Sequence, residues 1–217
     1  MSILLLSSTI AALALVPEVP PPKTCTLSGT VELLGPGGKK LDPRVARVYV
    51  RTAIPDDTPP RHHQMLQTNY QFEPRVLVIK QGDFVDFLNR DGVSHEVHST
   101  EVVNGFSLPK ENAKDTTHSQ QFNDVGISII GCHLHSTMRA TIITTPSVFH
   151  SAVGADGKWM ISGLSEQRVE VVIWVPDRPE ERIPLTPCVD KPISVSLRVP
   201  QAPRASPALG RYIGTEG

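Results

Sequence analysis

The sequence predicts an all-β protein. Short runs rich in β-branched residues recur between turn-forming residues, and no long amphipathic helical period is present. Proline is abundant, with 20 residues, whereas aromatic residues make up only 5% of the chain. At 217 residues, the chain is long enough for one large domain or two modest ones.

The charge balance argues against a nucleic-acid partner. The formal net charge is −1, and the chain contains neither a basic run nor a basic patch interleaved with aromatic residues. We therefore expect no nucleic acid among the partners.

An apolar run from Ile3 to Val16 opens the chain. It is too short to span a bilayer and is typical of the hydrophobic region of a secretory signal peptide, although no basic residue precedes it. The alternative is a buried first strand, which the proline-rich segment 17–22 disfavours. We expect residues 1–16 to be a signal peptide, the protein to be periplasmic or secreted, and the mature chain to lack a membrane span.

The chain after the apolar run begins with strand-like segments. Residues 26–33 and 47–51 are expected strands, and 55–60 (Pro-Asp-Asp-Thr-Pro-Pro) is an expected linker, because proline removes a hydrogen-bond donor and restricts the residue before it. His62 and His63 follow. Adjacent side chains on a loop rarely converge on a metal ion, so we expect these two histidines to be exposed to solvent.

The middle of the chain is a series of short apolar runs separated by polar turns. Strands are expected over residues 75–80, 84–88, 96–99, 119–122, 127–130 and 140–144. His98 and His118 are expected at the surface or at the rim of a site. His133 is expected to point away from its neighbour Cys132, because successive side chains of a strand alternate between faces.

The pattern changes after Pro146. A turn at 156–158 precedes an expected strand, and the nearly continuous apolar run 169–175 predicts a strand buried on both faces. Residues 193–199 alternate between apolar and polar and predict a half-buried strand. Residues 200–217 contain little to bury and are predicted to be a disordered tail.

The segment 131–138 carries the clearest chemical signal. Its spacing, Cys-x2-His-x2-Met, allows Cys132, His135 and Met138 to meet at one metal ion. Soft sulfur with imidazole suits copper, and two His, one Cys and a weak axial Met form the ligand set of blue-copper sites. His95, which follows an apolar strand ending in Asn-x-Asp, is the expected fourth ligand. The alternative is a buried structural cysteine beside surface histidines.

These motifs occur in the order found in cupredoxins. Phe72-x-Pro74, the apolar run 76–79, Gly82, the segment 89–95 and the short 132–138 loop resemble that family, and most closely its amicyanin-type members. The resemblance covers residues 66–145. It implies a Greek-key β-sandwich that holds one type 1 copper ion through His95, Cys132, His135 and Met138, with His135 near the surface. Compared with proteins that resemble the whole chain, described below, this one departs at Glu96, where many carry a second His, and at Arg139.

The flanks resemble a second family. Residues 29–31 with 46–50, and 156–164 with 171–174, look like two halves of a carboxypeptidase-regulatory-like, or transthyretin-like, β-sandwich. Neither half has enough strands for a stable sandwich by itself. We therefore expect one sandwich built from 24–54 and 147–199, interrupted by a cupredoxin at 66–145. This order resembles periplasmic proteins labelled as methylamine-utilisation proteins.

Cysteine usage fits an exported protein. If Cys132 binds copper, Cys25 and Cys188 are left as an even pair in a compartment where disulfides persist, and we expect them to be bonded. Two unrelated buried thiols are the alternative.

The ligand set predicts a one-electron carrier that is not an enzyme, because four protein ligands leave copper no open position for a substrate. Its partner would be a redox protein. Two alternatives stay open: a copper storage or delivery module, and a carbohydrate- or protein-binding module. The latter has little support, since only Trp159 and Trp174 are available for a Trp platform and the context of Trp174 predicts burial.

Overall fold

The computed structural model of this chain describes residues 23–52, 54, 56–110 and 116–200. It confirms the all-β prediction: within these ranges the helices are two short 3-10 turns, η1 (Pro36–Gly38) and η2 (Pro43–Val45). In the same ranges, no helix has the length and apolar character needed to cross a membrane. The expected signal peptide and the tail beyond Pro200 lie outside the described residues.

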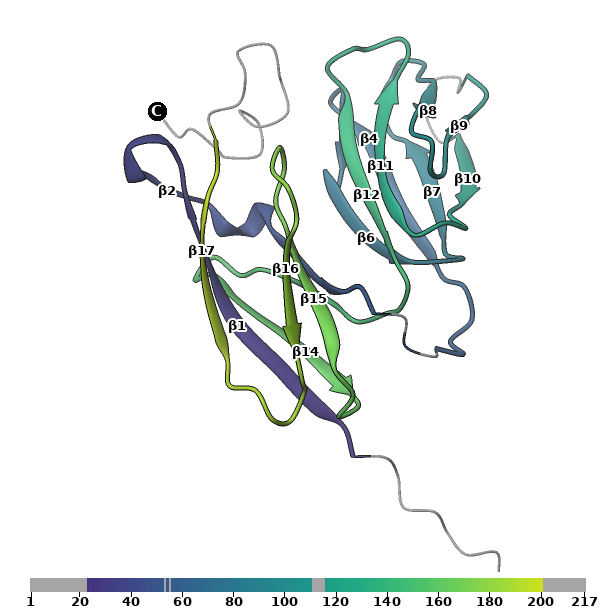
Figure 1. Cartoon of the computed structure of the whole chain (residues 1–217). Helices are drawn as coiled ribbons and strands as arrows, with labels where there is room; N and C mark the ends of the chain where they lie inside the picture. Colours follow the sequence, from purple (N-terminus) through teal and green to yellow (C-terminus); the bar gives the residue numbers. More distant parts are fainter. Residues whose placement is uncertain (1–22, 53, 55, 111–115, 201–217) are drawn as a thin grey trace, which may run out of the picture.

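Two of the four sheets combine strands from the beginning and the end of the chain. In one sheet the order is β14-β1-β17 with β2 beside β1, and in the other it is β13-β3-β15-β16. The strands are β1 (Cys25–Leu34), β2 (Lys40–Leu41), β3 (Arg47–Val50), β13 (His150–Ala152), β14 (Lys158–Leu164), β15 (Val169–Trp174), β16 (Glu181–Leu185) and β17 (Ile193–Arg198). Figure 1 shows the purple β1 lying beside the yellow β17, from opposite ends of the sequence.

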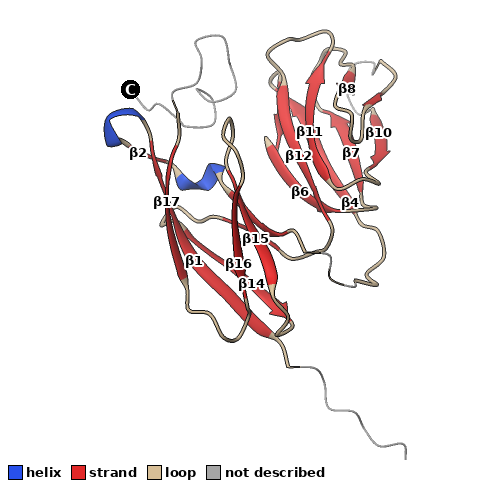
Figure 2. Ribbon diagram, viewed as in Figure 1, coloured by secondary structure: helices blue, strands red, loops and turns tan. Residues whose placement is uncertain are grey.

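The other two sheets use the middle of the chain. Their strand orders are β10-β7-β4-β5 and β6-β12-β11-β8-β9. The strands are β4 (His62–Thr68), β5 (Gln71–Glu73), β6 (Val76–Lys80), β7 (Phe84–Asn89), β8 (Val97–Ser99), β9 (Phe106–Ser107), β10 (Thr117–Gln121), β11 (Gly126–Cys132) and β12 (Arg139–Thr145). Strand β4 begins four residues before the predicted start of the inserted unit at 66. In Figure 2 these strands form a body beside the one made by the chain ends.

The burial of the strands follows their sequence patterns. β1 alternates, placing Leu27, Val31 and Leu33 in a core formed with strands of the facing sheet. β15 is buried along almost its whole length, as its continuous apolar run predicts, whereas β17 buries one face. A strand covered on both sides has no polar face to present, which is why its sequence does not alternate.

A second core fills the middle body and a third joins the two bodies. The second is formed by large buried side chains, including Met65, Phe72, Phe87, Phe122 and Ile142. The third gathers residues of both bodies: Tyr49, Val172 and Trp174 pack with Val76, Val78 and Ile143. The two bodies therefore share a packed apolar interface.

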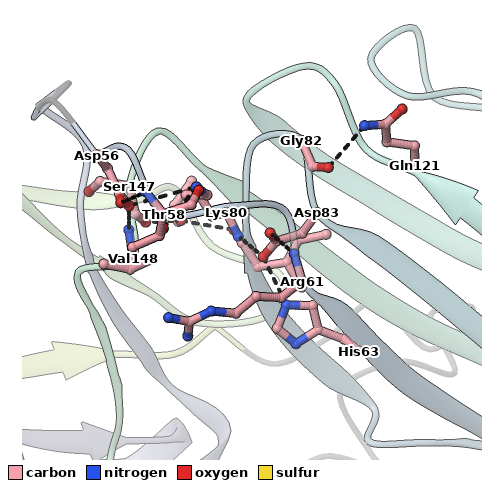
Figure 3. A network of polar contacts seen from close by, with 12 residues as sticks. Asp56, Thr58, Arg61, His63, Lys80, Gly82, Asp83, Gln121, Ser147 and Val148 are labelled. Carbon is pink, nitrogen blue, oxygen red and sulfur yellow. Dashed lines mark hydrogen bonds and ion pairs between the residues drawn. The ribbon is translucent and has the colours of Figure 1, made fainter.

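The chain passes between the two bodies twice, before β4 and after β12, and buried polar groups connect these two segments (Figure 3). The ammonium group of Lys80, a residue 8% exposed, donates to the carbonyl oxygen of Thr58 and to its hydroxyl at 2.9 Å. Asp56 lies 4.0 Å from that ammonium and accepts from the backbone N–H of Val148. The linker before β4 and the segment after β12 are thus tied to the end of β6.

The opposite end of the same sheet carries the metal-ligand motif. Along β12, Thr145 pairs with Lys80 at the interface, and Arg139 pairs with Gly131 next to Cys132. The seven residues of β12 span roughly 20 Å at the usual rise of a strand. The motif therefore lies at the end of β12 opposite the polar contacts of Lys80.

Candidate metal centre

Three predicted ligands meet at one end of the middle body, on the loop from β7 to β8, which connects the two sheets, and on the turn from β11 to β12, which stays within one sheet. Cys132 is the last residue of β11, and His135 lies in the turn that leads to β12. His95 lies in the loop between β7 and β8, and β8 brings this loop close because Val97 pairs with Cys132. The two motifs are 37 residues apart in sequence and become neighbours through one strand pairing.

The ligand atoms form a small triangle. The Nδ1 atoms of His95 and His135 are 3.1 Å apart. The sulfur of Cys132 lies 3.8 Å from Nδ1 of His95 and 3.7 Å from Nδ1 of His135. His95 and Cys132 are buried, and His135 is partly exposed.

This triangle fits one metal ion. Imidazole nitrogen and thiolate sulfur bind ions such as zinc at about 2.0 Å and 2.3 Å, so donor atoms sharing an ion lie roughly 3–4 Å apart. All three measured separations fall in that range. Two imidazoles with one thiolate in a trigonal arrangement are the donor set of type 1 copper sites. The residues present therefore fit copper.

Asp91 determines which nitrogen His95 offers. Its carboxylate lies 2.8 Å from Nε2 of His95. A carboxylate accepts hydrogen bonds, so the proton of the neutral ring sits on Nε2 and leaves Nδ1 free to face Cys132 and His135. Such a partner fixes both the tautomer and the orientation of a histidine ligand.

The Asp91 carboxylate is itself held in its ionised form. Burial opposes ionisation, but the backbone N–H of Tyr70, the ring of His95 and the backbone N–H of Asn69 outweigh it and hold the pKa of Asp91 below its usual value. The N–H groups donate at 3.1 Å from Tyr70 and 2.6 Å from Asn69. Asn89 orients the loop, since its side chain accepts from the N–H of Asp91 and donates to the carbonyl of Val93.

The two predicted sulfur ligands, Cys132 and Met138, lie against the protein core. The sulfur of Cys132 accepts the backbone N–H of Glu96 at 3.4 Å, which satisfies a buried atom through the backbone of the residue next to His95. Met138 is 1% exposed and packs in the same apolar core as Cys132. Its N–H donates to the carbonyl of His135, which closes the turn between them. Whether Met138 acts as the axial ligand stays a prediction.

The rim of the site contains aromatic rings. Tyr70, which is 48% exposed, meets His135 edge-on with ring centroids 4.9 Å apart and lies 6.3 Å from His95. His133 points outward and stacks on His98 at 3.7 Å. Burial and then the neighbouring His133 lower the pKa of His98. These two rings lie outside the ligand triangle.

His62 is exposed, as predicted, whereas His63 is only partly exposed. His62 and His63 lie on strand β4, so the prediction of a loop was wrong. His62 is within 3.0 Å of Asp86, and His63 is half-buried and 2.8 Å from Asp83. Adjacent residues of a strand point to opposite faces, so the two rings form separate pairs.

Sequence reasoning did not identify Asp91, or the turn at Asn69 and Tyr70 that contacts it, as part of the site. Asp91 was visible as part of an Asn-x-Asp segment four residues before His95, the signal that could have identified it as an orienting group. Tyr70 gave no such signal, because it is separated from His95 by 25 residues and from His135 by 65.

Cys25 and Cys188 are joined as a disulfide, with Cα atoms 5.2 Å apart. Cys132 is a free, buried cysteine. Trp159 and Trp174 are 3% and 6% exposed, so neither forms a surface platform for a sugar.

The sequence matches no protein-family model and has significant similarity to no curated protein. Among solved structures, the chain is similar to a purple cupredoxin from Nitrosopumilus maritimus, with 19% identity over 38% of this chain and 98% of that one, at a TM-score of 0.34. It is also similar to a reduced Cu(I) form of an amicyanin variant, with 22% identity over 45% of this chain and 97% of that one, at a TM-score of 0.37. These likenesses cover less than half of this chain, so the function proposed below is drawn from the site itself.

Proposed function

We propose that this chain is an exported, mononuclear type 1 copper protein that carries single electrons to or from a redox partner protein. The observation that supports the proposal is the triangle of Nδ1 of His95, Nδ1 of His135 and the sulfur of Cys132, with sides of 3.1, 3.7 and 3.8 Å. The disulfide supports export, because disulfides persist in oxidising compartments.

The residues of the site have distinct proposed roles in binding copper and in fixing its ligands. Cys132 binds as a thiolate, since a metal-bound cysteine is deprotonated. His95 is fixed from behind by Asp91, and Met138 is proposed as the weak axial ligand from the core. Copper, when bound, would supply a one-electron couple. The packed sandwich beneath these residues keeps their donor atoms in place in both oxidation states.

His135 is the proposed contact for the partner. Its ring is the partly exposed member of the triangle, whereas the other two side chains are buried. A redox protein that docks over this end of the body would therefore reach the His135 edge first. The two chain connections to the second body lie at the opposite end of β12.

Copper loading tests the proposal. Purified, oxidised protein with one equivalent of Cu(II) should show an intense visible charge-transfer band from thiolate to copper. Cys132→Ser should abolish the colour even if some copper stays bound. Met138→Leu should keep the colour and change the reduction potential, because the axial bond is weak and long. A colourless wild-type protein after copper loading would exclude a type 1 site.

Repeated redox cycling separates an electron carrier from a copper store. A carrier keeps one copper per chain while it passes between coloured and colourless states with a mild reductant and oxidant. A storage or delivery protein releases the metal instead. Rapid transfer of Cu(I) to a moderate chelator during cycling would reject the carrier function and favour delivery.

A further inference from the structure

The two-residue turn Asn69-Tyr70 joins β4 to β5. Thr68 pairs with Gln71, so the two strands are connected by the tightest common hairpin loop. Both turn residues have positive φ, 51° for Asn69 and 57° for Tyr70. This is the left-handed backbone of a type I′ turn, which asparagine tolerates and a tyrosine rarely adopts. A bulky residue is thus kept at a position where glycine is favoured.

The backbone of this turn points at Asp91. The N–H of Asn69 donates to one carboxylate oxygen at 2.6 Å, and the N–H of Tyr70 donates to the other at 3.1 Å. The second oxygen also meets Nε2 of His95 at 2.8 Å. The left-handed conformation directs both N–H groups to one side, so the turn, Asp91 and His95 form a continuous chain of hydrogen bonds.

The side chain of the same turn reaches the other imidazole. The Tyr70 ring meets the His135 ring edge-on, with centroids 4.9 Å apart and planes at 80°. Such aromatic pairs are favourable beyond the area they bury. His135 sits in a six-residue turn and is the more exposed imidazole, so the packed Tyr70 ring adds a restraint to those that His95 and Cys132 provide.

We propose that the Asn69-Tyr70 turn positions both imidazoles of the metal site: His95 through Asp91, and His135 through the Tyr70 ring. Tyr70 is a positioning residue that touches no metal. This inference rests on the proposed function, and it explains why a tyrosine occupies a backbone conformation that favours glycine.

The matched pair Tyr70→Gly and Tyr70→Phe tests the ring. Glycine suits the left-handed turn and keeps the N–H donor to Asp91, so it removes the ring while preserving the hairpin. Phenylalanine keeps the ring and removes the hydroxyl. In the copper-loaded protein, we expect Tyr70→Gly to change the visible band ratio and the Cu(II) electron paramagnetic resonance spectrum. We expect its copper to pass to a chelator about threefold to tenfold more readily. Tyr70→Phe should match the wild type.

If the Tyr70 ring only stabilised the fold, its loss would affect stability and not the copper site. It would lower the unfolding temperature of Tyr70→Gly and leave the copper spectra as in the wild type. Spectra and chelator transfer of Tyr70→Gly that equal those of the wild type would overturn the positioning role of the ring.

Metal-free protein tests the other half of the proposal. Long-range proton–nitrogen correlation spectra should show His95 in the wild type with its proton on Nε2, and Asp91→Asn should yield mixed tautomers. Asp91→Asn should also weaken metal binding on the order of 10–100-fold, as loss of a ligand's carboxylate partner usually does. Mixed tautomers in the wild type would overturn the role of the turn and Asp91. If the wild type binds copper without colour, the proposed function fails, whereas the metal-free spectra still decide the positioning.

Discussion

Removal of the Cys25–Cys188 disulfide should destabilise the protein through its unfolded state. The bond closes a loop with a sequence separation of 163 residues, which encloses almost the whole described chain. In the folded protein, the strands beside it are already aligned, since Gly29 of β1 pairs with Ile193 of β17. Loss of the bond therefore leaves native pairing intact and frees the unfolded chain.

The chain-entropy relation gives the magnitude. For a loop of this size it yields about 5 kcal/mol at 25 °C as an upper limit. Cys188 has a φ of 70°, a left-handed conformation that costs roughly 1 kcal/mol for a residue with a Cβ. Cys25→Ala with Cys188→Gly should therefore lose about 1 kcal/mol less than Cys25→Ala with Cys188→Ala.

Denaturant unfolding followed by tryptophan fluorescence is a suitable assay, because both tryptophans belong to the body that contains the disulfide. A Cys132→Ser background removes the third thiol. On that background, a reductant should destabilise the protein that retains Cys25 and Cys188 and leave the double variants unchanged. The free energy of unfolding should fall more steeply with denaturant concentration when the disulfide is absent, because the opened unfolded chain exposes more surface. Copper binding by the double variants with Cys132 intact should match the wild type.

Two results would refute this reasoning. The first is two free thiols at Cys25 and Cys188 in a non-reduced digest of the exported protein. The second is a free energy of unfolding that changes by less than about 1 kcal/mol on reduction, because the loop-closure entropy would then not contribute.

Three further predictions concern the sheets and their interface. Gly29→Ala should destabilise by about 1–3 kcal/mol in thermal unfolding, because a Cβ there would lie 2.3 Å from the carbonyl oxygen of Ile193; an unchanged midpoint would contradict this close approach. Lys80→Met should cost about 1–3 kcal/mol by leaving buried acceptors unpaired, with Lys80→Arg as the control that keeps the charge; equal loss in both would mean that packing matters and the charge does not. Burial opposes ionisation of Glu180, but the Tyr49 hydroxyl and two arginines outweigh it and lower the pKa of Glu180. The contribution of this carboxylate to folding stability should therefore be complete above about pH 4.3, the ordinary pKa of glutamate, and be lost as the pH falls through the pKa in the folded protein. Glu180→Gln should flatten this acid limb of the stability curve, and an unchanged limb would exclude the carboxylate as its source.

The strands were predicted accurately where the sequence either alternates between apolar and polar residues or is continuously apolar. The alternation in β17 and the continuous apolar run of β15 each predicted the burial that the structure shows. β4 was not predicted as a strand, because His62 and His63 follow a proline-rich linker and lack apolar alternation. Their strand exists because β7 pairs with it in parallel, a long-range contact that has no local signature.

Local spacing by itself determined the chemical character of the site. Cys132, His135 and Met138 lie within one short loop, so chain geometry alone keeps them close, and their donor types predict copper. His95 could be proposed because it follows a strand that ends at a polar turn. What only the tertiary structure decided is how the imidazoles are held: the Asn69-Tyr70 turn reaches Asp91 because β4 pairs with β7 in one sheet, and it reaches His135 on a turn of the other sheet. These contacts depend on how strands distant in sequence pair and pack, and no local sequence pattern predicts such pairing.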